Sequence, residues 1–184
     1  MPILTIELPV REDQTDFNLR RWTEMTSGTP LGRELARSEG RIETDRHGHS
    51  ILFRPSDFLR GCFQAELAFR LKDLLPAGEI VIACPISTAD GVKAADVAWI
   101  SRACRPMSGE ELCLTQAPGI CVEVVSPSNT RAEMAERKAL HFAAGADEVW
   151  FCDQTGFLTF YCAPNSDGEA TSTQCPAFPR QISL

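Results

Sequence analysis

The spacing of hydrophobic and polar residues changes several times along the chain between a helical period and a strand-like alternation. Helical spacing, ended by Gly and Pro residues, predicts helices over residues 16–25, 31–38, 57–75 and 130–144. Apolar runs bounded by turn residues predict strands over residues 3–8, 41–43, 50–54, 79–84, 94–101, 120–126, 148–152 and 157–162. From residue 57 onward the core order is helix, three strands, helix, strand, which predicts an α/β fold built on a central sheet.

Three regions follow from these elements. Residues 1–40 form an N-terminal extension with a strand and helices, and residues 41–162 carry the core. The core begins with a predicted β-hairpin, because turn-forming residues separate the strands at 41–43 and 50–54. Residues 163–184 are first a loop rich in Ser, Thr, Gly and Pro, and then return as an edge strand from residue 180.

Composition narrows the class of protein. The chain has 184 residues, 43% of them hydrophobic and 23% charged, which suits one globular domain. It has no apolar run of membrane-spanning length, and its first twenty residues do not form a signal peptide, so we expect a soluble, cytoplasmic protein with no membrane partner. The net charge of −7 argues against a protein that coats nucleic acid by bulk positive charge.

The eight cysteines include no Cys-x-x-Cys pair. Several of them, such as Cys84, Cys121 and Cys152, lie in apolar runs where a free thiol behaves as a small hydrophobic residue, so we expect reduced cysteines in the core. A disulfide-stabilised secreted domain is a weaker explanation, since no signal peptide is evident. His47 and His49 flank a glycine in the hairpin turn; either they are zinc ligands or the turn is a solvated loop, and the sequence favours the loop.

Two acidic residues interrupt otherwise apolar strands. Asp96 lies in Ala-Ala-Asp-Val-Ala-Trp-Ile, and Glu123 lies in Ile-Cys-Val-Glu-Val-Val. A carboxylate in such a strand is costly to bury unless a metal cation or a lysine pairs with it. One such acid is explained more simply by a half-exposed strand whose acid faces water. Two such acids on neighbouring strands favour a functional pair.

A lysine stands out in the helix that follows. Ala135, Ala139 and Phe142 form the apolar face expected for this helix, and Lys138 falls on the same face. The side chain can simply extend along that face to reach water. The chain has only three lysines, however, so one at this position is informative.

Asp96, Glu123 and Lys138, together with Glu66 of the helix at 57–75, form a candidate phosphodiester site. In that chemistry, carboxylates hold Mg²⁺, the metal stabilises charge on the phosphate, and the lysine positions or activates the attacking water.

The chain resembles the Uma-two family of endonucleases, which belongs to the restriction-endonuclease-like PD-(D/E)XK superfamily. The resemblance rests on Glu-Val-Val-Ser-Pro-Ser at 123–128, on Lys138 with an aromatic residue four positions later, and on Gly145 followed by Glu-Val-Trp-Phe-Cys-Asp at 148–153. It extends over about residues 31–184. It implies a restriction-endonuclease-like core with a mixed central β-sheet flanked by helices.

The resemblance also implies roles for individual residues. Asp96 and Glu123 are then the metal-binding acids, Glu66 is the acid of the first helix, and Lys138 is the lysine. Two positions depart from the pattern: Ala95 replaces the proline before the aspartate, and Val125 stands where the superfamily usually has its lysine. We therefore expect that the helix supplies the lysine instead.

The expected function is a Mg²⁺-dependent endonuclease, with Mn²⁺ able to substitute, that hydrolyses phosphodiester bonds in nucleic acid, in the first place DNA. By analogy with nucleases that cut two strands, a homodimer is expected. The alternative is a non-catalytic nuclease-fold module that binds or regulates. The acidic net charge and the lack of an evident DNA-reading element favour that alternative.

Overall fold

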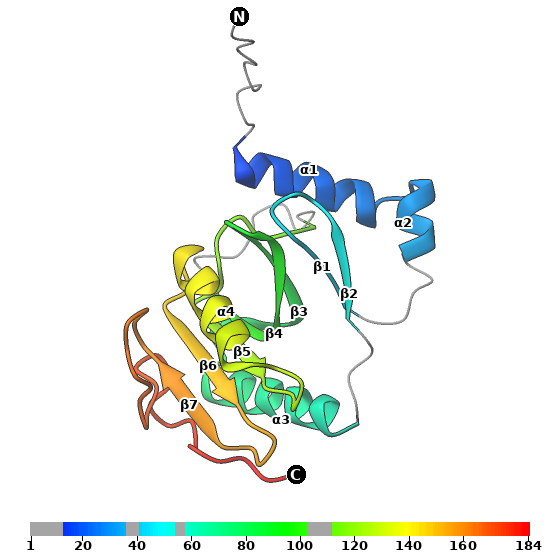
Figure 1. Cartoon of the computed structure of the whole chain (residues 1–184). Coiled ribbons are helices and arrows are strands. Elements are labelled where there is room, and N and C mark those ends of the chain that lie inside the picture. Colours follow the sequence, from blue (N-terminus) through cyan, green and yellow to red (C-terminus); the bar gives the residue numbers. More distant parts are fainter. Residues whose placement is uncertain (1–12, 36–40, 54–57, 103–111) are drawn as a thin grey trace, which may run out of the picture.

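A five-stranded mixed β-sheet forms the centre of the protein (Figure 1). The computed structural model describes residues 13–35, 41–53, 58–102 and 112–184. The sheet has the order β3-β4-β5-β6-β7, made of Gly78–Thr88, Gly91–Ser101, Ile120–Val124, Glu148–Cys152 and Leu158–Tyr161. Strands β5 and β6 run parallel because helix α4 connects them, and all other neighbours are antiparallel.

The four helices within the described ranges lie close to their predicted positions. They are α1, α2, α3 and α4, at Gln14–Thr26, Pro30–Leu35, Phe58–Leu74 and Arg131–Ala143. Helix α4 begins with a capping box between Thr130 and Glu133, and it ends before Gly145, whose φ of 103° suits glycine best. The predicted order of helix, three strands, helix, strand is confirmed. The expected strand at 3–8, the expected start of α3 near residue 57 and the end of the helix at 31–38 lie outside the described residues.

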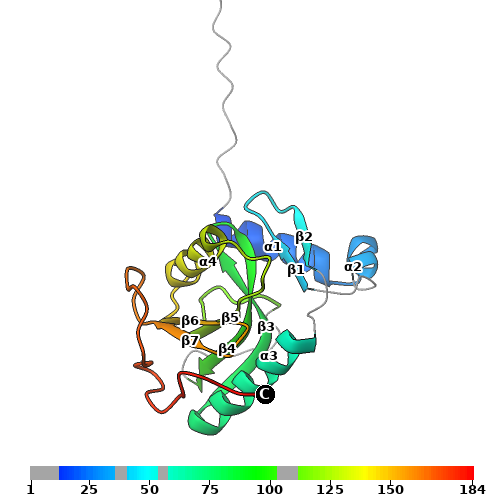
Figure 2. The same ribbon diagram turned by 60° about the horizontal axis from the view of Figure 1, so that its bottom comes forward.

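Helices α3 and α4 cover opposite faces of the sheet (Figure 2). On one face the stripe of Phe63, Leu67 and Leu71 packs against the sheet around Trp150, and the C-terminal segment closes this cluster. On the other face a smaller cluster joins β3, β4, β5 and β6 to the end of α4. The sheet is therefore buried on both sides, which explains the nearly continuous apolar runs of its inner strands.

The predicted hairpin, β1 at Arg41–Thr44 and β2 at Ser50–Phe53, forms a separate two-stranded sheet. It docks on the start of β4: Thr44 Oγ1 accepts a hydrogen bond from the Val92 backbone N–H at 2.8 Å. The approach is close at Gly91, where a Cβ atom would lie 2.4 Å from the Thr44 carbonyl oxygen. Helix α1 packs at the same end, since Asn18 Nδ2 donates to Thr88 O at 2.9 Å. Helix α1 also contacts the hairpin turn, where Arg21 Nε donates to Gly48 O at 2.8 Å, and thus holds the hairpin against the core.

Besides its apolar contacts, the C-terminal region is held by one buried carboxylate. Glu148 is buried and accepts hydrogen bonds from Trp150 Nε1, Ser172 Oγ, the hydroxyl and backbone N–H of Thr173, and the backbone N–H of Gln174. In place of the edge strand expected from residue 180, the chain makes an isolated bridge between Gln181 and Phe157.

The seven cysteines in the described parts of the chain are free, as expected, and five of them are buried. Burial raises the pKa of Cys84, Cys113 and Cys152 to about 12, so these thiols stay protonated and behave as apolar core residues. Every helix in those parts is too short or too polar to cross a bilayer.

Candidate active site

The ladder between β4 and β5 ends beside the two acidic strand residues. Its last antiparallel pair joins Val97 to Val122, so Asp96 and Glu123 are the next residues along the two strands. Burial and then the charge of Glu123 raise the pKa of Asp96, and this second effect requires the two carboxyl groups to lie close together. The structure therefore brings the two predicted acids together at the end of this ladder.

The ladder between β3 and β4 is also interrupted at Asp96. Its register pairs Ile82 with Val97 and Cys84 with Ala95, but Asp96 and Ala83, which lie between these pairs, do not pair. Ala83 has a φ of 50°, in the left-handed region that favours glycine. Next to this irregularity, Asp96 Oδ2 accepts a hydrogen bond from the Val124 backbone N–H of β5 at 2.8 Å. The Asp96 carboxylate thus accepts a hydrogen bond from a backbone N–H just beyond the end of the β4–β5 ladder.

Three side chains from two other elements bond to Asp96. Arg60 Nη2, in the first turn of α3, lies 2.7 Å from Oδ1 and 2.6 Å from Oδ2. Gln64, one helical turn later, donates from Nε2 to Oδ1 at 3.1 Å. Arg41 of β1 donates from Nη1 to Oδ1 at 2.7 Å. Asp96 is only 2% exposed, so these donors take the place of water.

Helix α4 supplies the partners of Glu123. Arg137 Nη1 lies 3.1 Å from Glu123 Oε1, and His141 Nε2 lies 2.8 Å from the same oxygen. The two residues are one helical turn apart and face the sheet together. His141 is completely buried, and Glu123 is 2% exposed.

A third acid, Glu43 of β1, links the two halves of the site. Its Oε1 lies 2.5 Å from Arg137 Nη2 and 3.2 Å from Arg41 Nη2. We call these six charged residues the acid–arginine cluster: Glu43, Asp96, Glu123, Arg41, Arg60 and Arg137. With all three acids ionised, three negative charges meet three positive charges, and the cluster is electrically balanced.

The acids of the cluster differ in their affinity for a proton. Burial raises the pKa of Asp96, the adjacent charge of Glu123 adds to this effect, and the arginines offset only part of it. Burial also opposes the ionisation of Glu123, but the charge of Arg137 and the hydrogen bond from His141 outweigh it and lower the pKa to about 2. Neighbouring acids whose pKa values are pushed apart are typical of functional sites.

Two surface hollows reach the cluster from different sides. One, of about 160 Å³, is lined by Glu43, Phe53 and Arg137 together with residues of β4 and α4. The other, of about 70 Å³, is lined by Arg60 and Val124 together with residues of α3 and of the segment after β5. The guanidinium groups of the cluster are therefore partly accessible although the carboxylates are buried, with side-chain exposures of 13% for Arg137 and 21% for Arg60.

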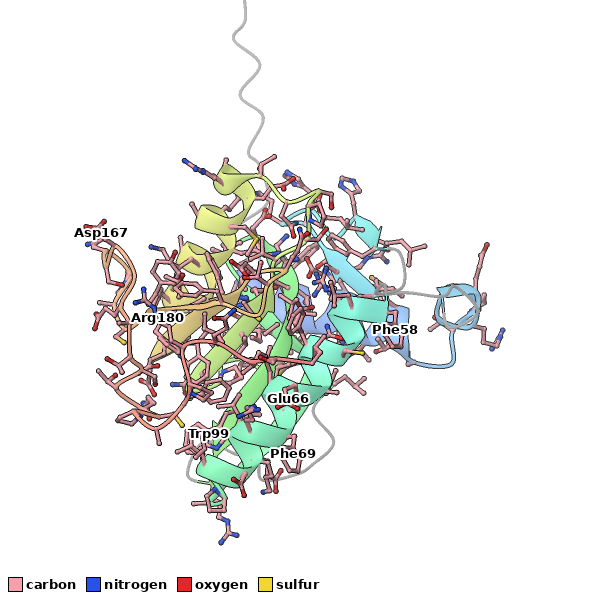
Figure 3. The ribbon with its side chains drawn as sticks, turned by 90° about the horizontal axis from the view of Figure 1, so that it is seen from below. Phe58, Glu66, Phe69, Trp99, Asp167 and Arg180 are labelled. Atoms are coloured by element: carbon pink, nitrogen blue, oxygen red, sulfur yellow. The ribbon has the colours of Figure 1, made fainter. Side chains whose placement is uncertain are left out.

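The structure does not bring Lys138 or Glu66 to this site. Lys138 Nζ lies 4.3 Å from the centre of the Tyr161 ring and 3.3 Å from Ser166 O, so it faces β7 and the C-terminal loop. Glu66, near the middle of α3 (Figure 3), pairs with Arg70 at 2.5 Å. Arg137 stands beside Glu123, where the lysine was expected, and Arg60 and Gln64 are the α3 residues that reach Asp96.

The expected apolar face of α4 is wrong for a physical reason. Ala135 and Ala139 are exposed, while Arg137 is largely buried and His141 is completely buried. Alanine favours helix formation but buries little apolar area, so alanines do not decide which face meets the sheet. The buried side of α4 carries Met134, Arg137 and His141, and the last two pair with Glu123, while Phe142 packs against the core as expected.

The arrangement does not suit a divalent cation as it stands. In the parts of the chain that the structure describes, no group of three or more His, Cys, Asp or Glu side chains is placed to hold a metal ion. Asp96 and Glu123 are the kind of ligand that Mg²⁺ uses, but Asp96 has both oxygens bonded to other donors. At the other candidate site, His49 Nδ1 lies 2.7 Å from Asp45 Oδ2, as in a solvated turn.

The arginines of the cluster, Glu43 and His141 were not among the site residues predicted from the sequence. One available signal was the Arg-x-Glu pattern of β1, which puts both charged side chains of a strand on one side. The other was the four-residue spacing of Arg60 and Gln64, and of Arg137 and His141, which places each pair on one helix face.

Comparisons with known proteins agree with this fold. The family model Uma2, described as a putative restriction endonuclease, matches residues 31–184. A crystal structure of a putative nuclease from Anabaena variabilis is similar with a TM-score of 0.60 and 16% identity, over 76% of this chain and 82% of that chain. A comparison with curated proteins gave no match. The chain belongs to the Uma2 family of putative restriction endonucleases.

Proposed function

We propose that this protein hydrolyses phosphodiester bonds in nucleic acid, in the first place DNA, at the pair formed by Asp96 and Glu123. The observation that supports this function most is the proximity of two buried acids on β4 and β5. Two like charges close together repel each other, and burying them costs more free energy still. Such a pair is explained more readily by a role in chemistry than by a role in folding, and the family of the chain agrees with that role.

The arginines of the cluster have a direct part in this proposal. A guanidinium group matches the oxygens of a phosphate with two parallel hydrogen bonds, as it matches a carboxylate. A backbone phosphate that enters the hollow beside Arg60 competes with Asp96 for this guanidinium group. Phosphate binding would thus hold the scissile group next to the two acids and release Asp96 from one of its partners.

The family implies Mg²⁺, with Mn²⁺ as a substitute, but the residues of the cluster do not fit a divalent cation in their present arrangement. No step of the proposal therefore depends on a metal. A second function is that of a non-catalytic nuclease-fold module. The ion pairs of the cluster favour it, because the arginines hold the carboxylates that would carry the chemistry.

We also propose a homodimer, which would bring two such centres to two strands of a duplex. Light scattering on the purified protein measures this oligomeric state. A cytoplasmic location is part of the proposal and agrees with the free thiols of the described cysteines.

A cleavage assay with matched variants tests the proposed activity. Supercoiled plasmid, linear duplex and single-stranded DNA are incubated with the protein in Mg²⁺, in Mn²⁺ and in EDTA. We expect cleavage by the wild type, loss of cleavage in Asp96→Asn and Glu123→Gln, and retention in Glu66→Gln, whose acid pairs with Arg70 on the surface of α3. Equal cleavage by the Asp96→Asn protein would reveal a contaminant. DNA binding without cleavage of any substrate would favour the second function.

A further inference from the structure

We infer that the arginines of the acid–arginine cluster take the place of a divalent cation in the free protein, so that Asp96 and Glu123 exclude Mg²⁺ and Mn²⁺ while no nucleic acid is bound. This inference rests on the proposed function only in taking this pair as the functional centre. It goes against the metal site that family membership implies, and it follows from coordination and charge.

Hydrogen-bond donors already surround the carboxylate of Asp96. Its Oδ1 accepts from Arg41, Arg60 and Gln64, and its Oδ2 accepts from Arg60 and the Val124 backbone N–H. A carboxylate offers about four lone-pair positions, and five hydrogen bonds occupy them all. A magnesium ion needs an oxygen at about 2.0–2.1 Å with open space around it. Asp96 provides neither the free lone pair nor the space.

The charges of the cluster are already balanced. Arg41 spans Glu43 and Asp96 at 3.2 and 2.7 Å, and Arg137 spans Glu43 and Glu123 at 2.5 and 3.1 Å. Three arginines therefore neutralise three acids. A bound divalent cation would add a charge of +2, and no acid of the cluster is left to balance it. The carboxylates of Asp96 and Glu123 are 2% exposed, and an unpaired buried charge is strongly unfavourable.

The arginines cannot make way for a metal ion by losing a proton, and two of them have further contacts that hold them in place. Arginine stays protonated in proteins at any physiological pH. Arg41 also donates to Ala94 O at 3.1 Å, and its guanidinium carbon lies 4.9 Å from the centre of the Phe53 ring. Arg137 lies 5.8 Å from the same ring. Contacts within the hairpin, and between the hairpin and α4, thus fix the guanidinium groups of Arg41 and Arg137 in the site.

Arg60 is the most exposed arginine of the cluster and gives the sharpest variant. Arg60→Gln removes two of the five bonds on Asp96 and leaves the cluster with a net charge of −1. Arg70→Gln, on the same helix, removes an equal charge from the whole protein but only breaks the pair with Glu66. Arg60→Lys keeps the positive charge but replaces the planar guanidinium group with an ammonium group.

The experiment is a titration of the chelator-treated protein with Mn²⁺, without nucleic acid, followed by electron paramagnetic resonance of the free ion. The relevant quantity is the binding that Asp96→Asn abolishes. We expect none in the wild type, in Arg70→Gln or in Arg60→Lys, and we expect binding in Arg60→Gln that is at least roughly tenfold tighter than the weakest binding the titration detects. Far-ultraviolet circular dichroism verifies that each variant is folded, and Arg41→Gln replaces Arg60→Gln if the latter fails to fold.

Two results would overturn the inference. One is Asp96-dependent Mn²⁺ binding by the wild type as tight as that of Arg60→Gln. The other is a folded Arg60→Gln or Arg41→Gln protein that gains no such binding. Neither result depends on cleavage, so the cleavage assay and this titration can fail independently.

Discussion

Arg60 donates hydrogen bonds from one nitrogen to both carboxylate oxygens of Asp96, at 2.7 and 2.6 Å. The first residue lies in the first turn of α3, and the second lies in β4 where the ladders to both neighbouring strands are interrupted. This contact fastens the start of the helix to the opening between β4 and β5. An ion pair thus stabilises a strand position that pairs with neither neighbouring strand.

The neighbouring residues Arg137 and Lys138 give the first prediction. Arg137→Ala leaves Glu123 and Glu43 buried with fewer counter-charges, and breaking a buried pair in this way costs about 3–5 kcal/mol of unfolding free energy. Lys138→Ala removes a contact with the Tyr161 ring and costs about 1 kcal/mol or less. Urea unfolding followed by circular dichroism measures both. An equal loss in the two variants would mean that Arg137 does not serve as the counter-charge.

Glu148 gives a prediction about stability and pH. All hydrogen-bond partners of Glu148 are donors, so Glu148→Gln places an amide N–H₂ against other donors. We expect the free energy of unfolding to fall by about 2–3 kcal/mol. Glu169→Gln, an exposed residue of the C-terminal region, is the control and should change little.

The pH dependence of the same variant follows from its ionisation. Burial opposes the ionised form of Glu148, but hydrogen bonds from Thr173, Ser172 and Trp150 outweigh it, so the pKa lies below its usual 4.5. A lowered pKa stabilises the folded state fully above the unfolded value, and this stabilisation is lost as the pH falls through the folded value. Unfolding measured from pH 7 to pH 3 should show the wild-type advantage shrinking below about pH 4.5. A constant advantage over that range would contradict the assignment.

Ala83 gives a prediction of the opposite sign. A residue with a Cβ atom pays about 1–2 kcal/mol in the left-handed region, whereas glycine enters it freely. Ala83→Gly should therefore stabilise the protein by about 0.5–1 kcal/mol, after the extra entropy of the unfolded glycine chain is counted. Ala98→Gly, at a buried regular position of β4, should destabilise it. Thermal unfolding of both proteins tests this, and a lower melting temperature for Ala83→Gly would show that the backbone there is not strained.

Much of the fold was predictable because its signals are local. The strand at 148–152 and the helix at 130–144 are bounded by a capping box, a glycine and a turn, and the structure has them within one residue of the predicted ends. The lengths of β3 and β4 were underestimated. These strands continue to a tight turn at residues 89–90, through a stretch that includes Pro85 and small polar residues. Cross-strand pairing overrides the weak strand propensity of that stretch.

Of the candidate site, only Asp96 and Glu123 were predictable. Asp96 and Glu123 stand out because each breaks an apolar run, which is a property of the sequence itself. Their partners come from β1, α3 and α4, and no local pattern reveals that these elements converge. The choice between Arg137 and Lys138 depends on a rotation of about 100° per residue around α4. Packing against the charged position on β5 sets this rotation.

The most direct test of the account is a crystal structure of the protein with a short duplex DNA whose phosphodiester links are replaced by slowly cleaved phosphorothioates. The account predicts a phosphate group within hydrogen-bond distance of the Arg60 guanidinium, next to the carboxylates of Asp96 and Glu123. DNA bound at another surface, with Arg60 still holding both oxygens of Asp96, would contradict it.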